Sequence, residues 1–103
     1  MAVIWLALAA ALNPTGIAMA TELVDVARLH CADVLTVDEA AAAALKADLR
    51  QFDIGGINSA VSPALNLFYE EFAAAAKADA AGFCTSVPDL AARAGYANIF
   101  RNR

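Results

Sequence analysis

The chain has little of most residue types that build catalytic or cofactor sites. Its 103 residues include one histidine, two cysteines and one tryptophan, and only 17% of them are charged. His30 has no second histidine to join it and no CxxC pair occurs, so zinc, haem and thioredoxin-type sites lack their ligands. The sequence also has neither a nucleophile-elbow serine nor a glycine-rich phosphate loop. An enzyme is therefore the least favoured class, and we expect no cofactor and no metal.

Positive charge is also scarce. Seven Lys and Arg residues stand against eleven Asp and Glu residues, which gives a net charge of −4. Nucleic-acid binding needs a clustered basic face, and Arg93, Arg101 and Arg103 near the C-terminus are better interpreted as solvated ends. Below pH ~3 most carboxylates would be neutral, and the net charge would rise to about +9. Self-repulsion at that charge loosens compact states and weakens self-association.

The N-terminal apolar run is short. It covers residues 2–12, far fewer than the ~20 residues of a membrane span, and Asn13-Pro14 interrupts it. Ala18-Met19-Ala20 then provides a small-x-small cleavage site. The pattern predicts a cleaved signal peptide over residues 1–20, a domain over residues 21–103, and a periplasmic or secreted protein without a stable membrane span. No Lys or Arg precedes the run, so a start further upstream or a core helix remains an alternative.

The two cysteines, Cys31 and Cys84, lie after this segment. In an oxidising compartment they would form a disulfide with only one connectivity. Chain entropy assigns roughly 4 kcal/mol to a loop of that size, which is comparable to the whole stability of so small a domain. The alternative is that both cysteines are free and buried, as in a cytosolic protein.

Alanine dominates the rest of the chain and predicts an all-α fold, a small single-domain bundle of about four helices with one disulfide. The first helix is expected over residues 22–35, with Val24, Ala27, Cys31 and Val34 on its inner face. The second is expected over residues 37–52, with Thr36 as N-cap and Glu39 at N3, and a glycine turn at residues 55–56 to end it.

Proline and glycine mark the remaining two helices. Ser62-Pro63 is expected to open the third helix, which carries an apolar stripe and stops at Gly82. A short fourth helix follows over residues 86–93 and ends before Gly95. The tail over residues 96–100 is apolar enough to pack back on the domain.

Neighbouring polar residues suggest sites that helix geometry does not support. His30 and Cys31 are adjacent, as are Asp38 and Glu39, and adjacent side chains on a helix diverge by about 100°. The pair Glu70-Glu71 diverges for the same reason. We interpret His30 as a partly exposed helical residue, and the first carboxylate pair as part of a helix cap.

Two cysteine-containing segments carry a resemblance to a known family. The segment Cys31-Ala32-Asp33-Val34-Leu35-Thr36-Val37-Asp38-Glu39, together with Cys84-Thr85-Ser86-Val87-Pro88, resembles the cysteine regions of the HdeA/HdeB family of periplasmic acid-stress chaperones. The resemblance implies a helical protein that is dimeric near neutral pH. Acid would dissociate and partly unfold it, and the apolar surface exposed would hold denatured client proteins in solution.

This hypothesis assigns roles to six residues. Cys31 and Cys84 would be the structural disulfide, and Leu49, Leu65, Phe68 and Phe72 would form the client or dimer surface. The expected partners are then a second copy of the chain and unfolded proteins. The alternative is a structural or accessory subunit of a cell-envelope complex with no acid response, which would keep an apolar patch exposed at neutral pH.

Overall fold

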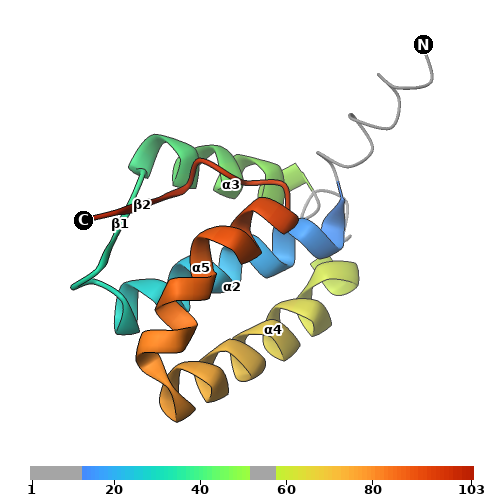
Figure 1. Cartoon of the computed structure of the whole chain (residues 1–103). Coiled ribbons are helices and arrows are strands. Elements are labelled where there is room, and N and C mark those ends of the chain that lie inside the picture. The colour runs from blue at the N-terminus through green and yellow to red at the C-terminus, as the bar shows by residue number, and fades with distance from the viewer. Residues whose placement is uncertain (1–12, 52–57) are drawn as a thin grey trace.

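The computed structural model describes residues 13–51 and 58–103. Over these residues the chain forms four helices and two short strands, in the order α2 (Pro14–His30), β1 (Leu35–Val37), α3 (Glu39–Gln51), α4 (Asn58–Ala78), α5 (Ala80–Arg93) and β2 (Phe100–Asn102) (Figure 1). The predicted all-α bundle with one disulfide is confirmed, with a small two-stranded sheet added to it. None of the helices described here is long and apolar enough to cross a membrane.

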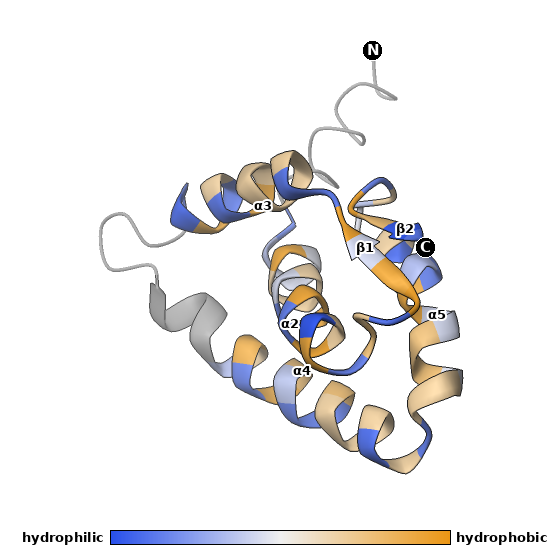
Figure 2. Cartoon of the chain, turned by 90° about the vertical axis from the view of Figure 1, so that its left-hand side faces the viewer, coloured by the Kyte–Doolittle hydropathy of each residue, from blue (hydrophilic) through white to orange (hydrophobic). Residues whose placement is uncertain are grey.

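Helix α2 is the centre of the bundle. It contacts the three other helices, with α3 on one side of it and α4 on the opposite side (Figures 1 and 2). Its buried residues recur around most of the helix because it has neighbours on several sides. The core joins α2 to α5 and to the last residues of the chain, and its largest fully buried side chains are Ile17, Leu23, Val26, Cys31, Val87 and Ile99.

The start of α2 corrects the predicted first helix. Asn13 is the N-cap, its side chain accepts a hydrogen bond from the Thr15 N–H at 2.9 Å, and Pro14 takes the first helical position. The dipeptide interpreted as a break in the apolar run is therefore a helix start, eight residues before the expected one. Thr21 lies inside the helix, where its hydroxyl donates to the Ile17 carbonyl at 2.7 Å.

This early start places residues 14–20 in the core. Ile17, Ala18 and Ala20 are completely buried. Gly16 lies so close to α5 that a Cβ atom there would come within 2.6 Å of the Ala94 carbonyl oxygen. Cleavage after Ala20 stays a prediction, and it would remove the first two turns of α2 together with these contacts.

The end of α2 also differs from the prediction. The helix stops at His30 rather than Leu35, and Cys31 closes its last turn by donating its N–H to the Ala27 carbonyl. Residues 32–34 form a turn that leads into β1. Val34 is consequently 51% exposed, not on the inner helix face, whereas Val24, Ala27 and Cys31 are buried as expected.

The N-cap of α3 is Asp38, not Thr36. The Asp38 carboxylate accepts a hydrogen bond from the Ala41 N–H at 3.0 Å, and Glu39 is the first helical residue. Thr36 is instead the middle residue of β1, so the predicted capping box does not form. Leu45 is buried, while Ala41 and Leu49 are half-buried against the core. The predicted helix end at Phe52 and the glycine turn at residues 55–56 lie outside the described residues.

The last two helices also begin earlier in the chain than predicted. Helix α4 begins at Asn58, four residues before the predicted serine cap, so that Pro63 lies within it. It ends at Ala78, and Asp79 caps α5 by accepting a hydrogen bond from the Gly82 N–H at 3.0 Å. Gly82 therefore belongs to the first turn of α5 rather than stopping the preceding helix, and α5 begins six residues before residue 86.

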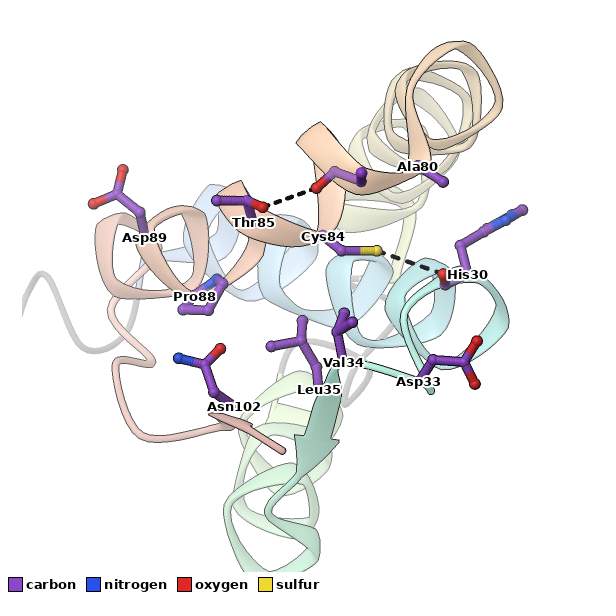
Figure 3. A pocket seen from close by; sticks show the side chains of 11 residues that line it. His30, Asp33, Val34, Leu35, Ala80, Cys84, Thr85, Pro88, Asp89 and Asn102 are labelled. Carbon is purple, nitrogen blue, oxygen red and sulfur yellow. Dashed lines mark hydrogen bonds between the residues drawn. The ribbon is translucent and has the colours of Figure 1, made fainter.

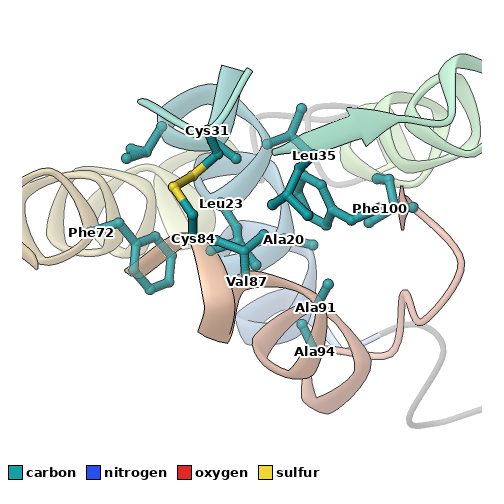
Figure 4. Close-up of a cluster of buried hydrophobic side chains, with 14 of the residues drawn as sticks. Ala20, Leu23, Cys31, Leu35, Phe72, Cys84, Val87, Ala91, Ala94 and Phe100 are labelled. Atoms are coloured by element: carbon teal, nitrogen blue, oxygen red, sulfur yellow. A yellow bond between two sulfur atoms is a disulfide. The ribbon is translucent and has the colours of Figure 1, made fainter. Parts of the chain in front are cut away.

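The C-terminal tail packs back on the domain, as predicted, and it does so as a strand. Ile99 and Phe100 are buried, and β2 pairs antiparallel with β1 in the register Leu35–Asn102, Thr36–Arg101 and Val37–Phe100. The Asp38 N–H donates to the Ile99 carbonyl at 2.8 Å and extends this connection to the start of α3. Figure 4 shows Phe100 and Leu35 beside the core residues of α5.

Candidate functional site

The disulfide is the best-defined feature of the site. Cys31 at the end of α2 and Cys84 in α5 are bonded with S–S 2.10 Å and Cα–Cα 5.5 Å (Figure 4). Both residues are buried, with 1% and 5% of their surfaces exposed. The predicted pairing is confirmed, and neither cysteine is free in this structure. Because Cys31 is bonded, it offers no thiolate for His30 to activate, and the imidazole of His30 is the one metal ligand that the pair could provide.

A pocket of about 620 Å³ lies beside this bond; we call it the disulfide pocket. Val34, Leu35 and Pro88 give it apolar walls, and the Cys84 sulfur lies 3.4 Å from the His30 carbonyl oxygen at one edge (Figure 3). Its polar lining residues are His30, Asp33, Thr85, Asp89 and Asn102. No three histidine, cysteine or carboxylate side chains gather to hold a metal within the described part of the chain.

The predicted client surface divides between two helices. Leu65, Phe68 and Phe72 lie on α4, whereas Leu49 lies on α3, on the opposite side of α2 (Figure 2). Phe72 is buried and stacks on half-buried Phe68, with ring centroids 5.8 Å apart. The ring of Phe72 also lies 6.1 Å from the ring of Phe83 in α5, a residue that the sequence did not indicate as part of this surface. The three α4 residues form one row, and Leu49 is separate from it.

Several large apolar side chains are exposed in the folded chain. Leu29 is 69% exposed and Leu67 is 55% exposed, and Val34 and Tyr69 are also largely accessible. Leu67 and Tyr69 are on α4, while Val34 lines the disulfide pocket. The exposure of Leu29 and Leu67 could not be predicted from the sequence, because it depends on which face each helix turns outward.

Three carboxylates tie α3 to the rest of the molecule. Glu39 receives two hydrogen bonds from the Arg28 guanidinium of α2, at 2.8 and 2.9 Å. Asp38 accepts one from Arg101 of β2 at 3.0 Å. Asp48 accepts one from the Tyr96 hydroxyl at 2.7 Å. The side chains of Asp38 and Glu39 thus reach different partners, as expected for adjacent positions, and act as structural contacts.

Two glutamates on neighbouring helices have opposite titration behaviour. Hydrogen bonds from Arg28, helped by the charges of Arg28 and Lys46, hold the pKa of Glu39 below its ordinary value. On α2, partial burial and then the charge of Asp25 raise the pKa of Glu22 above its ordinary value. Acid therefore removes a favourable interaction from α3 and relieves an unfavourable one in α2.

The chain matches no protein-family model, no curated protein and no solved structure.

Proposed function

We propose that this chain is a secreted or periplasmic holdase that acid activates, so that it binds unfolded proteins at low pH. The observation that carries the proposal is the dependence of three contacts between distant elements on ionised carboxylates: Glu39 with Arg28, Asp38 with Arg101, and Asp48 with Tyr96. Protonation removes the charge from each acceptor, and charge-assisted hydrogen bonds are roughly twice as strong as neutral ones. Acid therefore weakens each contact, by a modest amount in the pairs of Arg28 with Glu39 and of Arg101 with Asp38, because these are largely exposed to water.

The disulfide supports the same function in a second way. It ties α2 to α5 independently of pH, so a chain that loosens in acid keeps a compact helical core. The change in net charge from −4 to about +9 adds self-repulsion, which favours dissociation of copies and keeps a client-bound chain soluble. The expected partners are a second copy near neutral pH and unfolded proteins in acid.

Apolar surface for clients is available on α4. Phe68 is half-buried, and the buried Phe72 lies between Phe68 and Phe83, so loosening of α4 would expose an aromatic row. Aromatic side chains contribute a large apolar contact area to a complex. Leu65 lies one turn before Phe68 and extends the row.

The test is suppression of aggregation by the oxidised protein. A globular enzyme that precipitates below pH 3 is mixed with the chain, and light scattering is followed at pH 7 and pH 2.5. We expect suppression only at the lower pH, and a reduced effect for Phe68→Ser. Leu67→Ser, on the same helix but already exposed, is the matched control and is expected to act like the native chain. A chain that stays folded and leaves scattering unchanged at pH 2.5 contradicts the proposal.

A second candidate is an accessory subunit of a cell-envelope complex. The exposed Val34 beside the disulfide pocket provides apolar surface at neutral pH of the kind that this function requires, and Leu29 exposes a further apolar side chain. It predicts a partner that copurifies with the native chain and is lost from Val34→Ser, and a circular dichroism spectrum that is unchanged from pH 7 to pH 2. A loss of tertiary signal in acid excludes it.

A further inference from the structure

Helix α3 is attached to the bundle by less apolar contact than its neighbours. Its only buried side chains are Ala42 and Leu45, whereas α2 and α5 bury larger sets and are joined by the disulfide. Its main helix neighbour is α2. Polar contacts therefore carry a larger share of the attachment of α3 than they do elsewhere in the fold.

Three hollows border α3. A cavity of about 70 Å³ lies between it and α2, lined by Val24 and Arg28 on one side and by Leu45 and Lys46 on the other. A pocket of about 270 Å³ lies at its first turn, beside Glu39, and another of about 210 Å³ separates it from residues 95–99. These concavities are open to solvent and leave part of the surface of α3 without packed neighbours, so its apolar interface with the bundle is small for its length.

The charged groups around α3 change their balance in acid. Asp25 and Arg28 face α3 from α2, Arg101 faces it from β2, and Tyr96 from the loop before β2, while Arg103 lines the pocket beside Glu39. Helix α3 and its cap contribute five charged groups of their own, which are Asp38, Glu39, Lys46, Asp48 and Arg50. When the carboxylates are protonated, Arg28, Lys46 and Arg101 keep their charges. The neutral-pH attraction between α2 and α3 then becomes repulsion across their cavity.

Acid has opposite effects on the stability contributed by Glu39 in α3 and by Glu22 in the adjacent helix α2. The hydrogen bonds from Arg28 stabilise folded α3 above the ordinary pKa of a glutamate, and this contribution is lost as the pH falls through the lowered pKa of Glu39. The cost of keeping Glu22 charged in folded α2 is present at neutral pH and disappears on acidification. The two effects follow one another as the pH falls, because acid first relieves the unfavourable charge of Glu22 in α2 and then, at lower pH, removes the favourable contribution of Glu39 to α3.

We propose that α3 is an acid-released cover, which detaches from α2 before the disulfide-linked α2–α5 core loosens and thereby uncovers an apolar surface formed by Val24 and by the inner face of α3 with Leu45 and Leu49. The use of this surface for unfolded clients rests on the proposed function. The release itself does not, since it follows from the carboxylate contacts, the cavities and the remaining cations. Leu49, which is separate from the α4 row, would thus contribute to the apolar surface that the release of α3 uncovers.

The experiment is amide hydrogen exchange followed residue by residue by NMR on the oxidised full chain, between pH 7 and pH 2.5, with protection factors corrected for the intrinsic rate. We expect protection in α3 to fall by roughly tenfold or more while protection in α2 and α5 is retained. Glu39→Gln should move the opening of α3 to higher pH. Glu71→Gln, the same change at an exposed position of α4, is the matched control and should leave it in place.

The outcomes separate the two proposals. Loss of protection in α3, α2 and α5 in one common step overturns the release of α3, even if aggregation is suppressed. Early release of α3 without any suppression of aggregation supports the cover and overturns the holdase function. Early release together with suppression that begins at higher pH in Glu39→Gln supports both.

Discussion

The Tyr96 hydroxyl donates a hydrogen bond of 2.7 Å to the Asp48 carboxylate, which lies 48 residues earlier in the chain. Burial, followed by the hydrogen bond and the charge of Asp48, raises the pKa of Tyr96, so the phenol stays protonated and remains the donor. The contact joins α3 to the loop before β2, and Tyr96 also lines the pocket between that loop and α3. It is a direct side-chain link between the middle of the chain and its C-terminal end.

Tyr96→Phe removes this link and keeps the ring. We expect the free energy of unfolding at pH 7 to fall by about 1 kcal/mol, because the hydrogen bond is lost and the carboxylate remains partly exposed to water. Urea unfolding followed by circular dichroism measures the change. Tyr69→Phe, at a 43% exposed position of α4, is the control and is expected to match the native chain. Equal losses of stability in both variants would mean that the effect comes from removing any tyrosine hydroxyl, not from losing the hydrogen bond to Asp48.

The two glutamates with shifted pKa values give a second prediction, with opposite signs. At pH 7, Glu39→Gln should lower the melting temperature because the bond from Arg28 loses its charge, and Glu22→Gln should raise it because a costly charge is removed. Both differences should shrink on acidification, the Glu22 difference first, as the pH falls through its raised pKa, and the Glu39 difference only below the ordinary pKa of a glutamate. Thermal unfolding at pH 7, 5 and 3 measures this convergence; differences that persist undiminished at pH 3 contradict it.

The disulfide gives a third prediction. Replacing both cysteines with serine should reduce the free energy of unfolding by about 4 kcal/mol, because the long loop between α2 and α5 regains its entropy in the unfolded chain. The native chain melted with and without a reductant is the companion experiment, since it leaves the sequence unchanged. A melting temperature that is the same in all three samples would mean that packing around Leu23 and Val87 holds the core without the bond.

Short-range patterns predicted the helical fold and the cysteine pairing, but not several boundaries. Asn13-Pro14 is compatible either with a break in the apolar run or with the start of a helix. Which of the two forms depends on whether residues 14–20 pack against distant residues such as Ala94. Thr36 and Asp38 are both good caps, and Asp38 acts as one because β1 pairs with β2 and takes Thr36 into a strand. Strands of three residues with partners far along the chain leave no periodic signal.

The candidate site was less predictable from the sequence than the fold, because it too depends on contacts between residues that are far apart in the chain. The cysteine pairing was predictable because the chain has only two cysteines, and Phe68 and Phe72 were predictable as neighbours because they are four residues apart on one helix. Leu49 has the same apolar character, yet it faces a different neighbour, which only the placement of α3 reveals. The contacts of Arg28 and Arg101 with carboxylates join residues that are distant in sequence, and charge alone does not pair them.

Gly16→Ala gives a prediction about close packing between α2 and α5. The new methyl group would meet the backbone carbonyl of Ala94, which has no side-chain freedom to move aside. We expect a loss of about 1–3 kcal/mol, as is typical of overpacking, despite the better helix propensity of alanine. Urea unfolding measures it, and an unchanged or higher stability would show that α2 and α5 are not in contact at this point.

The first turns of α2 give the last prediction, which compares a chain that begins at Asn13 with one that begins at Thr21. The shorter chain lacks Ile17, Ala18 and Ala20, and the burial of Ile17 alone is worth about 1.5–3 kcal/mol. It also lacks the Asn13 cap, so α2 would begin without its first two turns. We expect the shorter chain to melt at a clearly lower temperature than the longer chain in circular dichroism. If both melt together, residues 14–20 contribute nothing to the folded core, and processing after Ala20 is compatible with a fully stable domain.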